Sequence, residues 1–297
     1  MCKSNITVKK FLKLILQIEF YRIIICLIFA FFGYEEFSVW SFVKVLIPVK
    51  EINDNFTSSF LVFFLFIPFL NILLKHLSER MHLRFIFLCL FLYTFLSTLS
   101  YLDFGVTMNY VSWFIVIYFI SSYLRLYPKK LFGNTKVWDI TSAVSIVVSV
   151  LSILVPLRFI WHEPYYFIAD SNKVLAVITA FCLFLFFKNV KIPYIKFINV
   201  VASATFGVLL IHANSDAMRQ WIWKDTLQNT VVFNTSWCYV HFVYSVLGIY
   251  IICTVIDLIR IYTLEKPFFK RYDKVSDKFY SKFYKLENKL TSKFNIR

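Results

Sequence analysis

The feature that constrains this chain most is a series of apolar runs, most of them long enough to cross a membrane. An α-helix needs roughly 17 to 25 residues to cross about 30 Å of hydrocarbon. The runs lie at residues 11–32, 56–74, 83–102, 109–127, 138–160, 174–187, 197–211 and 239–262. Backbone amides in lipid must be hydrogen-bonded within their own segment, so every run is expected to be helical. The sequence therefore predicts an all-α fold, a polytopic transmembrane helical bundle with about eight spans.

The composition excludes an ordinary soluble domain. Hydrophobic residues make up 59% of the 297 residues and charged residues only 16%, whereas globular chains have about 45 to 50% apolar residues. The net charge of +15 would suit a nucleic-acid-binding protein, but Lys and Arg stand in short runs between the apolar segments rather than on one soluble face. We therefore expect the lipid bilayer as a partner, and no nucleic acid.

Several common chemical motifs are missing from the sequence. The six cysteines include no CxxC pair and no Cys/His grouping with the spacing of zinc ligands. With five glycines in the chain, a glycine-rich loop that cradles phosphates is not expected either. No metal cofactor is predicted.

Lysine and arginine are distributed unevenly between successive loops. Short cytoplasmic loops are enriched in both residues. Segments 1–10, 75–84, 125–136, 188–196 and 266–297 are rich in Lys and Arg, whereas the intervening loops hold few. This alternation predicts an even number of spans, with both termini in the cytoplasm.

The same pattern suggests a simple domain organisation. Residues 1–265 are expected to form one membrane-embedded helical domain, followed by a basic and aromatic cytoplasmic tail at 266–297. The tail repeats Lys with Phe and Tyr, as in KFYSKFYK at 278–285. It is either an amphipathic helix on anionic lipid or a solvated basic tail that fixes the topology.

Four polar residues, Lys13, Gln17, Glu19 and Arg22, interrupt the first apolar run. Such groups are costly inside a membrane unless they face protein or water. Glu19 and Arg22 are three positions apart and share a helix face. One interpretation is that they line a polar cavity that admits a substrate. The alternative is an internal ion pair that holds helices together, or a cytoplasmic helix end that lies among the lipid headgroups.

Pro68 and Asn71 have a structural interpretation, and Arg125 has a structural and a functional one. Pro68 lies inside the second run, where it removes a backbone hydrogen bond and bends the helix; Asn71, one turn later, can cap the carbonyl that it frees. Arg125 precedes Pro128 at the cytoplasmic end of its run. It is either a topology anchor or a ligand for a phosphate.

The stretch 197–228 concentrates polar groups at the end of an apolar run: His212, Asn214, Asp216 and Arg219. Imidazole is the usual general base near neutral pH, and Arg219 can hold an anionic or carbonyl group nearby. A histidine at a helix end can equally be a hydrogen-bonded structural residue. The spacing alone leaves both roles open.

Four ordered segments resemble the acyltransferase 3 family: FTSSFLVFFLFIPFLNILLKHLSER, WFIVIYFISSYLRLYP, ATFGVLLIHANS with the following Arg219–Trp223, and IDLIRIYTLEKPFF. Members of this family are integral membrane enzymes that move acyl groups, commonly acetyl from acetyl-CoA, onto sugars of bacterial surface polysaccharides. The resemblance implies a membrane-bound O-acyltransferase of the bacterial inner membrane. Acyl-CoA would be the donor, and a cell-surface polysaccharide or its lipid-linked precursor the acceptor.

The resemblance also implies roles for residues of this chain. His212 and Arg219 would be catalytic. A base must take the proton of the sugar hydroxyl, and a donor must stabilise the thioester oxyanion. The cytoplasmic Arg125 would meet the phosphates of CoA, and the acceptor would meet groups near the outer face. The residues expected to bind substrate are Asn214, Trp223, Arg125, Glu19 and Arg22.

One family feature is missing from the sequence. Members carry an Arg and a His eleven positions apart in their first membrane helix. None of the five histidines here has an Arg eleven positions before it. The chain is therefore expected to lack the first two helices of the family. This leaves two alternatives to an active enzyme: a truncated, inactive paralogue with a structural or modulatory role, and a transporter of glycan intermediates.

Overall fold

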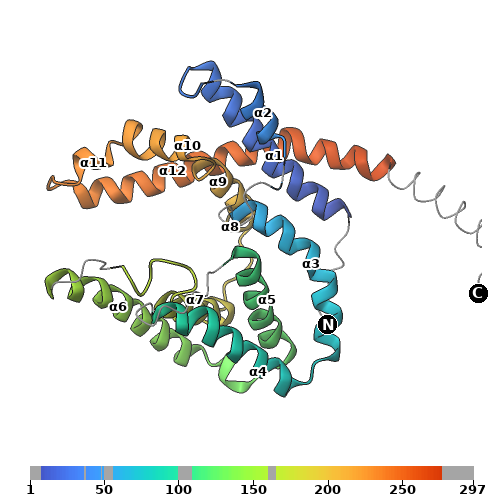
Figure 1. Cartoon of the computed structure of the whole chain (residues 1–297), viewed down its shortest axis with the longest axis vertical. Helices are drawn as coiled ribbons and strands as arrows, with labels where there is room; N and C mark the ends of the chain where they lie inside the picture. Colours follow the sequence, from blue (N-terminus) through green and yellow to red (C-terminus); the bar gives the residue numbers. More distant parts are fainter. Residues whose placement is uncertain are drawn as a thin grey trace, which may run out of the picture. The chain divides into compact units, whose positions relative to one another are not determined.

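The computed structural model describes residues 8–36, 38–47, 49, 56–99, 109–159 and 165–275. Within these residues every regular element is a helix and none is a strand (Figure 1), which confirms the all-α prediction. The chain divides into two compact units. Unit 1 comprises Met1–Glu19 and Val43–Tyr194, and unit 2 comprises Phe20–Phe42 and Ile195–Arg297.

The helices of unit 1 follow the predicted apolar runs within a few residues. α1 (Val8–Phe31) begins in this unit and continues into unit 2, and the short α2 (Val39–Val45) also belongs to both. The remaining helices of unit 1 are α3 (Phe56–His76), α4 (Glu79–Leu90), the π-helix η1 (Phe91–Leu96), α5 (Tyr110–Leu126), the 3-10 helix η3 (Lys130–Gly133), α6 (Thr135–Phe159) and α7 (Val174–Asn189).

Unit 2 is built from shorter helices around one long one. They are α8 (Lys196–Ser203), α9 (Thr205–His212), α10 (Asp216–Gln220), the π-helix η4 (Trp221–Thr226), α11 (Asn229–Val232), α12 (Cys238–Arg260) and the π-helix η5 (Ile261–Glu265). From α12 the chain stays helical through η5 to Val275, 38 residues in all. The first ten residues of the predicted tail are therefore helical, and the rest of it lies outside the described residues.

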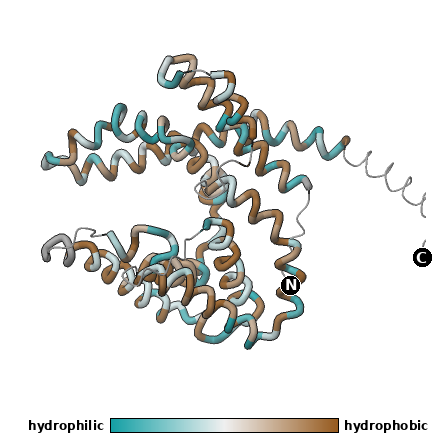
Figure 2. The backbone as a smooth tube through the Cα atoms, in the orientation of Figure 1, coloured by the Kyte–Doolittle hydropathy of each residue, from teal (hydrophilic) through white to brown (hydrophobic). Residues whose placement is uncertain are grey.

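Four helices of the described chain are long and apolar enough to cross a membrane: Lys9–Phe31, Phe56–His76, Thr135–Leu154 and Cys238–Val275. Figure 2 shows hydrophobic residues along most of α3. A fifth span results if Lys196–His212 and Asp216–Thr226, which are bent by 98°, count as one broken span. The chain has the helices of a membrane protein. The predicted number of about eight spans is not confirmed, in part because α5 and α7 have only 17 and 16 residues.

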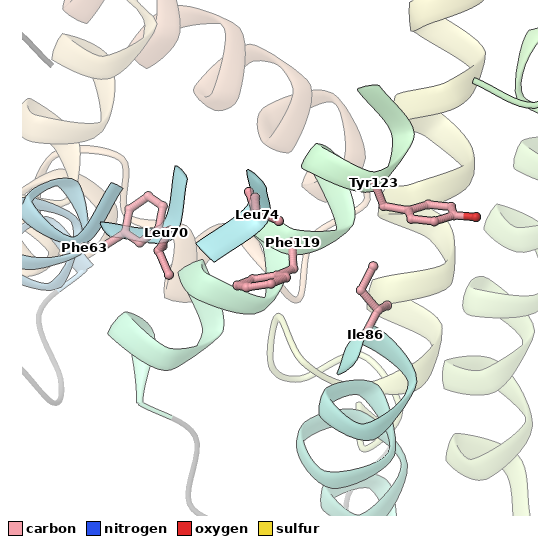
Figure 3. Packing of buried hydrophobic residues seen from close by; sticks show 6 residues of the cluster. All are labelled: Phe63, Leu70, Leu74, Ile86, Phe119 and Tyr123. Atoms are coloured by element: carbon pink, nitrogen blue, oxygen red, sulfur yellow. The ribbon is translucent and has the colours of Figure 1, made fainter. Parts of the chain in front are cut away.

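An apolar core of unit 1 lies among α3, α4 and α5. Side chains from the three helices meet in one buried cluster (Figure 3): Phe63, Leu70, Leu74, Ile86, Phe119 and Tyr123. A hydrogen bond fixes α3 to α5 on the same side, because the Tyr118 hydroxyl donates to Oδ1 of Asn71 at 2.6 Å. The Asn71 side chain thus bonds to Tyr118 of the neighbouring helix. Pro68 lies inside α3, which continues through it.

Candidate functional site

His212 is the last residue of α9 and is half-buried. Its Nδ1 lies 2.7 Å from the carbonyl oxygen of Val208, one turn earlier. A carbonyl oxygen only accepts hydrogen bonds, so Nδ1 carries the proton and donates it, and Nε2 of the neutral ring presents a lone pair. In the described part of the chain, no group forms a hydrogen bond with Nε2. The ring is therefore held in the tautomer in which Nε2 is the nitrogen that can accept a proton.

The turn after His212 is shaped by two polar side chains. Asn214 donates from Nδ2 to the carbonyl of Leu210 at 3.0 Å and satisfies an acceptor that the end of α9 leaves open. Ser215 caps the start of α10, since its Oγ accepts from the backbone N–H of Met218 at 3.1 Å. These bonds end one helix and start the next, so His212 stands at a sharp bend of the chain.

Arg219 lies on α10, on the far side of this turn. Its Nη1 is 3.4 Å from Oδ1 of Asp216, and the two side chains are 58% and 97% exposed. Exposed pairs of this kind bind weakly, so the guanidinium is available to another anion. No hydrogen bond or ion pair links His212 with Arg219 within the described residues of unit 2.

Trp223, another predicted substrate-binding residue, is half-buried in η4. This π-helix is tied to the end of α1, where Phe29 contacts the Trp221 ring edge-on with centroids 6.0 Å apart. The Tyr34 hydroxyl donates to Oδ2 of Asp225, and this hydrogen bond raises the pKa of Tyr34 to about 12. The predicted residues of the stretch 197–228 thus share one part of unit 2.

The other predicted site residues lie on α1 and α5. Glu19 and Arg22 are both half-buried on α1, Glu19 in unit 1 and Arg22 in unit 2. Arg125 is exposed in the last turn of α5, in unit 1. Glu19 and Arg125 therefore belong to unit 1, whereas Arg22 belongs to unit 2, as His212 does.

Lys129, close to Arg125 in the sequence, belongs to a small polar cluster of unit 1. Its Nζ is 2.6 Å from Oε1 of Glu79, and the Tyr123 hydroxyl donates to the same oxygen at 3.0 Å. The Lys129 ammonium holds the pKa of Glu79 below its usual value, and the Tyr123 hydroxyl acts in the same direction. The Lys129 ammonium thus already has a carboxylate partner.

The most deeply buried charged group among the described residues of unit 2 was not predicted as a site. Asp257 on α12 is fully buried, and its Oδ1 accepts from the Tyr21 hydroxyl and from Nε of Arg260, each at 2.7 Å. Arg260 also donates from Nη1 to Oε2 of Glu265 at 2.9 Å. Its guanidinium lies 5.7 Å from the centre of the Tyr21 ring. We refer to Tyr21, Asp257, Arg260 and Glu265 as the Asp257 cluster.

The π-helix η5 explains how Arg260 reaches Glu265. In an α-helix, residues five apart point away from each other, because neighbours on one face are three or four apart. A π-helix closes its hydrogen bonds between residues five apart, so it brings such residues onto the same face. The sequence contains one signal for this cluster. Asp257 and Arg260 are three residues apart, the spacing of an ion pair on one helix face, and they lie within an apolar run.

Some polar atoms of the Asp257 cluster have no partner among the described residues. They are Oδ2 of Asp257 and Nη2 of Arg260, and Oγ1 of Thr254, one turn earlier on α12, is buried in the same way. Unpaired buried polar atoms are costly, and each calls for an explanation. In the part of the chain that the structure describes, no group of three or more His, Cys, Asp or Glu side chains could hold a metal ion.

Comparison of the chain with models of protein families, with curated proteins and with solved structures found no match. The resemblance to acyltransferase 3 enzymes therefore rests on the four sequence segments alone.

Proposed function

We propose that this protein is a multi-pass membrane O-acyltransferase, which moves an acyl group, acetyl in the first instance, from acyl-CoA to a hydroxyl of a surface polysaccharide or its lipid-linked precursor. The observation that supports this proposal is the state of His212. Its Nδ1–H is engaged by the Val208 carbonyl at 2.7 Å, which leaves Nε2 as a base at the end of a helix. Removing a proton from a hydroxyl requires such a group.

The proposed reaction assigns a role to each polar group around His212. Nε2 takes the proton of the acceptor hydroxyl while that oxygen attacks the thioester carbonyl. Arg219, with its exposed guanidinium, stabilises the oxyanion that forms. The carbon–sulfur bond then breaks, and the thiolate of CoA leaves and receives the proton from Nε2. Asn214 and Trp223 contact the acceptor sugar.

The proposal includes a topology. The eight apolar runs cross the bacterial inner membrane, with both termini in the cytoplasm. Arg125, exposed at the end of α5, binds the phosphates of acyl-CoA on the cytoplasmic side. Glu19 and Arg22 line the polar path through which the donor reaches the acceptor side. The lysine and arginine distribution of the loops supports this arrangement.

The test is acyl transfer in membranes that contain the protein. Radiolabelled acetyl-CoA is supplied, and label is counted in the polysaccharide and lipid-linked glycan fractions. His212→Asn keeps an amide donor for the Val208 carbonyl but has no basic nitrogen, so transfer should fall by about 100-fold or more. His76→Asn, at an exposed histidine in the last turn of α3, is the matched control and should leave transfer unchanged. Transfer at the wild-type rate by the His212 variant would refute its role, and no transfer by the wild type would refute the activity.

A further inference from the structure

The Asp257 cluster lies in the core of unit 2, where α12 packs against α9. We propose that Asp257 is a positioning residue for the base: it sets the place of α9 through contact with Gly207, and thereby the place of His212. This inference rests on the proposed function for the role of His212. The contact between α9 and α12 is independent of that function.

Gly207 on α9 lies directly against the carboxylate of Asp257. A Cβ atom added to Gly207 would be 2.0 Å from Cγ of Asp257 and 2.4 Å from each carboxylate oxygen, whereas real Cβ atoms essentially never come within 3.0 Å of a non-bonded atom from another part of the chain. Only glycine therefore fits while the carboxylate keeps its position. The missing side chain lets the α9 backbone approach α12 closely, as small residues do in membrane helix pairs.

The carboxylate is not free to move out of the way. Its Oδ1 receives hydrogen bonds from Tyr21 on α1 and from Arg260 on its own helix, each at 2.7 Å. Arg260 is itself fixed by Glu265 at 2.9 Å. Asp257 is fully buried and the Arg260 side chain is 7% exposed, so these charge-assisted bonds form away from water, where they are stronger. The carboxylate is therefore held in place, and α9 packs against it at Gly207.

The position of α9 determines the position of His212, because His212 is the last residue of this helix. His212 follows Gly207 by five residues on the same helix, about 7.5 Å along its axis. The carbonyl that sets the tautomer of His212 belongs to Val208, the residue next to Gly207. A shift of α9 at Gly207 thus displaces the ring and its tautomer-setting acceptor together. A displacement of about 1 Å in an active site can lower the rate by about 100-fold.

The first test uses acyl transfer by the full chain in membranes. Gly207→Ala places a methyl group where the carboxylate stands, so kcat should fall by about 100-fold while KM for acetyl-CoA stays the same. Adding Asp257→Ala to this variant removes the clash and should restore part of the lost kcat. Gly248→Ala is the matched control, because nothing lies within 4 Å of a Cβ at this helical glycine. A wild-type kcat in the Gly207→Ala variant would overturn the proposal.

A second readout reports the position of His212 without any acyl transfer. Diethyl pyrocarbonate modifies neutral histidine rings, and mass spectrometry of the peptides gives the rate at each ring. Gly207→Ala should change the rate at His212 several-fold and leave His241, which bonds to Asn229 at 3.0 Å, unchanged as an internal reference. If the wild type transfers no acyl group but Gly207→Ala still changes the modification rate at His212, the positioning contact is supported and only the proposed function is refuted. An unchanged rate at His212 overturns the positioning contact even if acyl transfer is found.

Tyr21→Phe replaces Gly207→Ala if the larger side chain prevents folding, as judged by size-exclusion chromatography in detergent. It removes one of the two bonds that hold Oδ1 of Asp257 and adds no volume. We expect a several-fold lower kcat, an unchanged KM and a changed modification rate at His212. Wild-type values for all three quantities would overturn the proposal.

Discussion

Replacing Arg260 with alanine should destabilise the protein far more than replacing Asp257. Arg260 is the central residue of the Asp257 cluster, since it pairs with Asp257 at 2.7 Å and with Glu265 at 2.9 Å. Arg260→Ala leaves two buried carboxylates without their cation. Asp257→Ala leaves Arg260 paired with Glu265, but leaves two donors, the Tyr21 hydroxyl and the Nε–H of Arg260, without an acceptor.

The difference can be estimated from the burial of the groups. The side chains of Arg260, Asp257 and Glu265 are 7%, 0% and 8% exposed, so water cannot replace a lost partner. Removing one partner of a buried ion pair costs about 3–5 kcal/mol; Arg260 is the partner of two carboxylates, so Arg260→Ala should reach the upper end of this range. Leaving a buried donor unsatisfied costs about 1–3 kcal/mol; Asp257→Ala leaves two donors unsatisfied, so it should reach the upper end of that range. The two variants should therefore differ by about 2 kcal/mol in the free energy of unfolding.

The assay is unfolding by increasing dodecyl sulfate in mixed micelles, followed by tryptophan fluorescence, since Trp221, Trp223 and Trp237 belong to unit 2. Arg219→Ala is the matched control, because its 58%-exposed side chain pairs with the exposed Asp216 and should contribute less than about 1 kcal/mol. Equal losses for Arg260→Ala and Asp257→Ala, or a larger loss for Asp257→Ala, would show that Arg260 is not the centre of the network.

Two further predictions concern unit 1. Lys129 lowers the pKa of Glu79 in the folded protein. The pair therefore stabilises the fold above about pH 4.3, the ordinary pKa of a glutamate. This stabilisation is lost as the pH falls through the lower pKa of the folded state. Thermal denaturation at a series of acidic pH values should therefore show a smaller pH dependence for Glu79→Gln than for the wild type, and identical slopes would contradict the pairing. The hydrogen bond from Tyr118 to Asn71 at 2.6 Å should give a coupling energy of about 0.6 kcal/mol, and at most about 1.7, in a double-mutant cycle of Tyr118→Phe and Asn71→Leu. A coupling energy of zero would mean that the two helices do not depend on this bond.

Most of the helices and their approximate ends could be predicted from the amino-acid sequence. The run at 56–74 became α3 (Phe56–His76), the run at 109–127 became α5 (Tyr110–Leu126) and the run at 174–187 became α7 (Val174–Asn189). This works because a backbone in an apolar environment must satisfy its hydrogen bonds within one segment, which makes helix formation a local property. The place of His212 at the end of a helix, before a polar turn, also follows from local sequence.

Which polar groups meet, and how deeply they are buried, depends on how the helices pack. Tyr21 and Asp257 are 236 residues apart in the sequence, and no local pattern pairs them. The contact of Gly207 with the same carboxylate depends on which faces of α9 and α12 pack together. The Arg260–Glu265 pair depends on a π-helix, which the usual helical spacing does not anticipate. Hydropathy is a property of each residue and reveals the segments; the energies of buried charges depend on distances and burial, which exist only after the segments have packed.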